Sequence, residues 1–64
     1  MKTILLQTKR NLENQLFNLT LDSNGEVLSP RMLKIELGLN ESKSLAFEFL
    51  EDEIFRIGRI INEL

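Results

Sequence analysis

An unbroken apolar repeat near the C-terminus limits the folds that are open to this 64-residue chain. Apolar residues recur there at alternating steps of three and four positions, a spacing that places side chains along one face of an α-helix. The repeat consists of Phe47, Leu50, Ile54, Ile57, Ile61 and Leu64. It predicts one long helix over about residues 41–63, with an apolar seam that something must cover.

A second helical pattern lies at the N-terminus. Leu5, Leu12, Leu16 and Leu19 follow steps of seven, four and three residues, so residues 3–19 are predicted to be helical. The composition agrees, because the chain has thirteen Leu and six Ile but a single Val, and Leu favours helices whereas Val favours strands.

A short third helix is predicted between these two. Ser29 is a good N-cap and Pro30 is tolerated in the first helical turn, where its missing N–H is not needed. Gly38 is typical of the residue that ends a helix. These signals predict a helix over residues 30–37, and the whole chain, residues 1–64, is expected to form one all-α domain, a small three-helix bundle.

The segment between the first two predicted helices has two interpretations. Asp22-Ser23-Asn24-Gly25 is a turn signal, because Asp and Asn bond to the local backbone and Gly accepts a positive φ. The flanking residues 19–21 and 26–28 could pair across this turn as a short β-hairpin. Alternatively, residues 19–28 hold only a helix end and a loop.

The composition excludes most catalytic chemistry. The chain contains no Cys and no His, so it lacks a thiolate nucleophile, the usual general base and the common ligands of transition metals. We therefore expect no enzyme activity, no catalytic residues, no metal site and no cofactor. No apolar run is long enough to span a membrane, and we expect a cytoplasmic protein.

Acidic residues gather on the predicted long helix, at Glu48, Glu51, Asp52 and Glu53. Helical neighbours three or four residues apart share a face, so such carboxylates could bind a hard cation. No calcium-loop motif accompanies them, however, and a solvated helix face is the simpler interpretation.

The same helix is the predicted partner-binding element. A domain near 60 residues buries only about 60% of its unfolded surface, and no disulfide is available to strengthen this one. Phe49, Phe55 and Ile60 also lie off the seam, so the helix has more apolar surface than a short chain easily covers. We expect a homodimer, a complex with a larger protein, or both, with an interface of Phe49, Ile54, Phe55, Ile57 and Ile61 rimmed by Glu51 and Asp52.

Charge is divided unevenly along the chain. Residues 1–34 carry five basic and three acidic side chains, a balance of +2, and residues 35–64 carry three basic and seven acidic ones, a balance of −4. The complementary signs favour the first half packing on the last helix, of the same chain or of a second copy.

The alternative function is DNA binding. The stretch from Leu28 to Leu45, with its Leu37-Gly38-Leu39 turn, resembles the helix-turn-helix of bacterial transcription regulators. The resemblance covers about twenty residues and implies a regulator that contacts DNA through the start of its recognition helix. Those positions are Asn40, Glu41, Ser42, Lys43 and Ser44. The acidic face that follows opposes this function, because phosphates would repel it.

Overall fold

The protein is an all-helical chain, and the computed structural model describes all 64 of its residues. Helix α1 spans Lys2–Asn18, α2 spans Pro30–Leu39 and α3 spans Glu41–Glu63. The all-α prediction is confirmed, and the predicted ranges of the first and last helices agree with α1 and α3 to within one residue.

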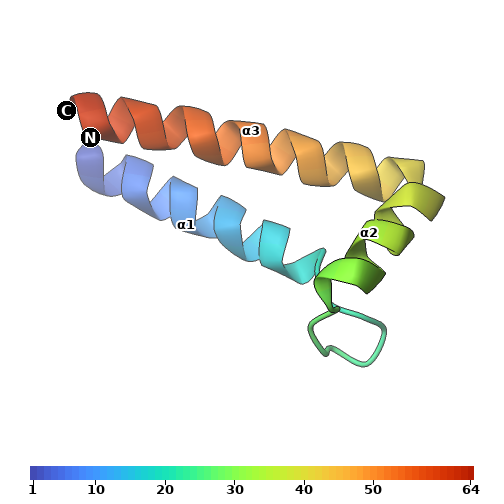
Figure 1. Cartoon of the computed structure of the whole chain (residues 1–64). Coiled ribbons are helices and arrows are strands. Elements are labelled where there is room, and N and C mark those ends of the chain that lie inside the picture. The colour runs from blue at the N-terminus through green and yellow to red at the C-terminus, as the bar shows by residue number, and fades with distance from the viewer.

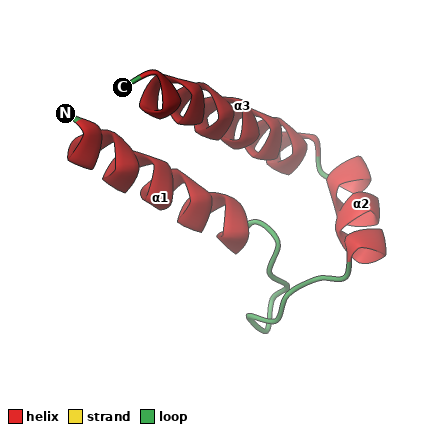
Figure 2. Ribbon diagram, turned by 60° about the vertical axis from the view of Figure 1, so that its left-hand side comes forward, coloured by secondary structure: helices red, strands yellow, loops and turns green.

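Helices α1 and α3 run antiparallel, so the two chain termini lie together at one end of the molecule (Figure 1). Helix α2 lies across the other end, joined to α1 by a loop (Figure 2). The result is an elongated molecule with extents of 38 × 20 × 17 Å.

The arrangement differs from the predicted three-helix bundle. Helix α2 contacts α3, but none of its Cα atoms comes within 8 Å of a Cα atom in α1. With ten residues, α2 is only about 15 Å long, and it bridges the end of one long helix to the start of the other. The fold is therefore a helical hairpin with a short helix across one end.

The core of the hairpin is thin. Only Leu50 and Ile57, both on α3, are buried. Around them lie half-buried apolar side chains from the two predicted seams: Leu5, Leu12 and Leu16 of α1, and Phe47, Ile54 and Ile61 of α3. The seams thus meet each other as the helical spacing predicts.

Lys9 occupies the one polar position on the inner face of α1. It is half-buried, and its Cε would lie 3.7 Å from a Cβ built on Gly58 of α3. Its methylene stem therefore covers part of α3, while its Nζ lies 4.0 Å from Glu13 Oε2, as amphipathic side chains often do.

The loop after α1 contains a turn and no strands. Gly25 has a φ of 80°, and Asp22 Oδ1 accepts hydrogen bonds from the backbone N–H groups of Asn24 and Glu26. Pairing across the turn is limited to an isolated antiparallel bridge between Leu21 and Val27. The predicted turn is confirmed, whereas the β-hairpin considered for residues 19–28 is reduced to that bridge.

The junction between α2 and α3 corrects one prediction. Helix α2 begins at the predicted cap, where Ser29 Oγ accepts a hydrogen bond from the Met32 N–H at 3.3 Å. It does not end at Gly38 but continues to Leu39. Asn40 is the only residue between the two helices. Its N–H donates to the Glu36 carbonyl of α2 at 3.0 Å, and its Oδ1 accepts from the Lys43 N–H of α3 at 3.0 Å. One residue thus caps both helices.

Candidate interaction surface

The most unusual property of the molecule is the amount of apolar surface that it exposes. Thirteen large apolar side chains are exposed, against two that are buried. Monomeric soluble proteins scatter single apolar residues over their surface but rarely expose a large contiguous apolar patch. Four of the thirteen lie on α3, and a fifth directly follows its last residue: Leu45, Phe49, Phe55, Ile60 and Leu64.

The residues predicted to form an interface fall into two groups. Ile57 is buried and Ile54 and Ile61 are half-buried, on the side of α3 that packs against α1. Within the single chain, α1 therefore covers Ile57 and part of Ile54 and Ile61.

The other predicted interface residues remain open. Phe49 and Phe55 are exposed, as are Glu51 and Asp52. Leu45 and Ile60 are also exposed on the same helix, although neither belongs to the predicted interface. Both residues lie off the seam in the sequence. That position indicates an open surface only when α1 is known to cover the seam.

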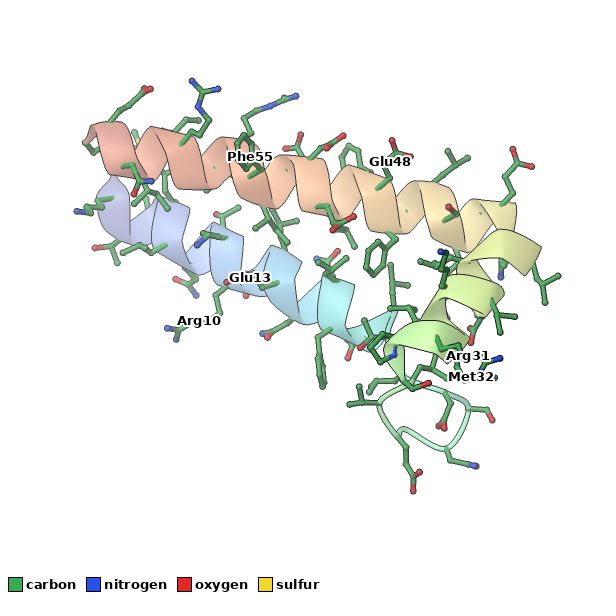
Figure 3. The ribbon with its side chains drawn as sticks, in the orientation of Figure 1. Arg10, Glu13, Arg31, Met32, Glu48 and Phe55 are labelled. Carbon is green, nitrogen blue, oxygen red and sulfur yellow. The ribbon has the colours of Figure 1, made fainter.

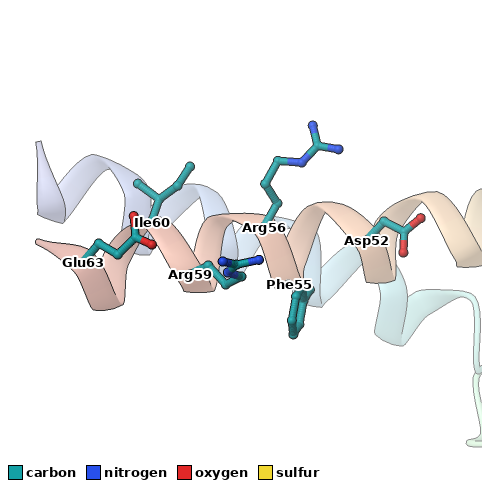
Figure 4. A pocket seen from close by; sticks show the side chains of 6 residues that line it. All are labelled: Asp52, Phe55, Arg56, Arg59, Ile60 and Glu63. Atoms are coloured by element: carbon teal, nitrogen blue, oxygen red, sulfur yellow. The ribbon is translucent and has the colours of Figure 1, made fainter.

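A shallow hollow of about 440 Å³ lies along the outer part of α3. Its lining side chains all come from this one helix, with Arg56 and Ile60 at one edge and Phe55 at the opposite edge (Figure 4). A surface formed by a single helix cannot enclose a small molecule. The hollow is suited to contact with another helix. Its lining residues are Asp52, Phe55, Arg56, Arg59, Ile60 and Glu63.

The acidic residues of α3 do not converge. Glu48 points away from α1 into solvent, while Arg10 projects from the opposite edge of the helix pair (Figure 3). Glu53 pairs with Arg56 at 3.4 Å instead of joining the other carboxylates. No group of three or more acidic side chains is placed to hold a metal ion, so the cluster is a charged helix face.

The candidate DNA-contacting residues are partly used by the fold itself. Asn40 caps both helices, and Lys43 is tied to Glu36 of α2 by an ion pair. Ser44 is half-buried like Lys43, whereas Asn40, Glu41 and Ser42 are exposed. Two of the five side chains, including the only cation, are thus engaged within the protein.

The single-residue junction is another difference from a helix-turn-helix, whose two helices are joined by a turn of three or four residues.

None of the three helices combines the length and the apolar character that crossing a lipid bilayer requires. Comparisons with protein families, curated proteins and solved structures find no match for this chain.

Proposed function

We propose that this protein is a non-enzymatic regulatory or adaptor module that acts through helix-mediated contacts with other proteins, and that it works as a homodimer. The observation that carries the proposal is the shortage of interior. Only two of the 64 residues are buried, while exposed apolar side chains remain on all three helices. A partner that covered these side chains would remove their apolar surface from water, which is favourable.

The size of the shortage can be worked out. A compact monomer of 7.5 kDa has an accessible surface of about 4,200 Å², whereas this chain exposes 5183 Å². The excess of about 1,000 Å² is comparable to the roughly 800 Å² that each partner buries in a standard protein–protein interface. The surplus surface is therefore of the size that one partner would cover.

The shape supports the same proposal. A compact domain of this length has a radius of gyration of about 10.7 Å, and this chain has 13.4 Å. Two elongated helical hairpins can pack side by side into a four-helix arrangement, which has a deeper core than either hairpin alone. Pairing would thereby supply the interior that the single chain lacks.

Sedimentation equilibrium at micromolar concentration tests the proposal, with circular dichroism to confirm that the sample is helical. We expect twice the 7.5 kDa chain mass and a midpoint of thermal unfolding that rises with protein concentration, as linkage requires for a folded dimer. A helical monomer whose unfolding midpoint does not depend on concentration would show that the homodimer is wrong.

A further inference from the structure

One side of α3 has a pattern of residue types that is the same in both directions along the helix. Six residues, of which Leu45 is the first, are spaced at steps of four, four, three, four and four positions. The spacing keeps the five that belong to α3 on one side of the helix, and the sixth, Leu64, is the C-cap residue that follows it. We call them the outer stripe: Leu45, Phe49, Glu53, Arg56, Ile60 and Leu64. The four apolar members are between 41% and 65% exposed, so the hairpin leaves the stripe open.

The stripe has the same character in both directions along the helix. Its midpoint lies between Ile54 and Phe55, and each apolar member has an apolar counterpart at the same distance on the other side. In its centre, Glu53 has Arg56 as its counterpart, and the two form an ion pair at 3.4 Å. The stripe is therefore apolar at both ends with opposite charges in the middle.

This symmetry matters because a twofold dimer uses the same surface patch on both chains, and the patch must be complementary to itself. We infer that the α3 helices of two copies pack antiparallel along their outer stripes. Phe49 then faces Ile60 of the second copy, and Leu45 faces Leu64. Glu53 faces Arg56 of the second copy. The inference rests on the homodimer of the proposed function and adds its surface, register and direction.

The central charges select the direction. In the antiparallel pair every Glu53 meets an arginine, whereas a parallel pair with the same stripe would place Glu53 against Glu53 and Arg56 against Arg56. Like charges at an interface disfavour the wrong arrangement, and this selection of register is a main role of interfacial charge. The stripe is thus suited to antiparallel pairing alone.

Helix α2 also has a row of exposed apolar side chains, Met32, Ile35 and Leu39. The charges beside this row, however, are not complementary to themselves. Arg31 lies beside Met32 (Figure 3) and Lys34 directly precedes Ile35 in the sequence, and neither cation forms an ion pair. A second copy on the same surface would bring cations against cations. The outer stripe of α3 is therefore the better match for an identical chain.

Disulfide cross-linking tests the register without background, because the chain contains no Cys. Phe49→Cys and Ile60→Cys proteins are prepared separately, then oxidised alone and as an equal mixture. In the inferred dimer, positions 49 and 60 of different chains are adjacent, whereas two copies of position 49 are about 16 Å apart along the helix axis. Cys residues so far apart cannot form a disulfide.

We expect the mixture to yield at least about tenfold more covalent dimer than either variant alone. Leu6→Cys and Phe17→Cys form the matched control pair, because they are also eleven residues apart and are 49% and 53% exposed on α1. Their mixture should show no enrichment over the separate samples.

A charge exchange provides the second measurement. Glu53→Arg alone should raise the dissociation constant of the dimer about tenfold, and adding Arg56→Glu should restore it, because the double variant again pairs opposite charges. Two results would overturn the inferred register while the homodimer remains valid. One is a dimeric wild type whose dissociation constant the Glu53→Arg change leaves unaltered, and the other is cross-linking that favours position 49 with itself. A monomeric wild type would instead refute the homodimer first.

Discussion

Ile57 is the best single test of how the hairpin is held together. It is one of two buried residues and lies near the middle of α3, on the side that packs against α1. We predict that Ile57→Ala lowers the free energy of unfolding by about 2–3 kcal/mol. The matched control is Leu39→Ala, which removes the same number of carbon atoms from a side chain that is 84% exposed.

The magnitude follows from the environment of the side chain. Replacing Ile by Ala removes three methylene-sized groups, worth about 0.8 kcal/mol each when they are fully buried. Ile57 is 9% exposed, so nearly all of this is lost, but its half-buried neighbours can relax into the gap, which limits the further penalty for a cavity. A chain of this length has a total stability of about 3–10 kcal/mol, so the loss is a large share of it.

Urea denaturation followed by circular dichroism measures both variants, at one fixed protein concentration because dimerisation is linked to stability. The Ile57→Ala midpoint should fall strongly, and a thermal scan should show a drop of about 10–20 °C. Leu39→Ala should stay within about 0.5 kcal/mol of wild type. Equal losses in the two variants would refute the placement of Ile57 in the core and of Leu39 in solvent.

Three further predictions concern the ends of the helices and the alternative function. Asn40→Ala should cost about 1 kcal/mol in a urea titration, since its Oδ1 caps α3, and Asn40→Asp should retain most of the stability. Gly25→Ala and Gly38→Ala should act in opposite directions in the same assay. Gly25 has a φ of 80°, so a side chain there costs about 1 kcal/mol, whereas Gly38 is helical with open space at its Cβ position and gains up to about 1 kcal/mol. In a gel-shift assay with random duplex DNA at low salt we expect no retardation; a retarded band that weakens steeply as salt rises would instead favour DNA binding.

The local features of this protein were predictable from its sequence. The start of α2 at Ser29, the turn at Asp22-Ser23-Asn24-Gly25 and the bounds of α1 and α3 depend on capping groups, on the φ preference of Gly and on helical periodicity. Each acts over a few residues. The inward-facing sides of the two long helices were predictable for the same reason, since the seam spacing fixes which residues share a face.

The end of α2 was predicted wrongly because two local capping signals compete there. Gly38 carries the usual signal for a helix end, but that signal competes with Asn40, whose backbone and side chain together satisfy groups on both helices. Lys43 adds an ion pair to Glu36 across the same junction. Asn40, two positions after Gly38, is the stronger capping residue, so α2 continues to Leu39.

Local sequence patterns are thus enough to predict that the chain forms helices, where most of them begin and end, and that α3 has more apolar surface than one neighbouring helix can cover. Which part of that surface stays exposed depends on how the helices pack. Helix α1 covers the seam of Leu50 and Ile57, whereas the short α2 lies across one end of the hairpin and does not extend along α3 (Figure 1). Periodicity assigns residues to faces of a helix, but exposure depends on the length and position of the neighbouring helices, which no local pattern specifies.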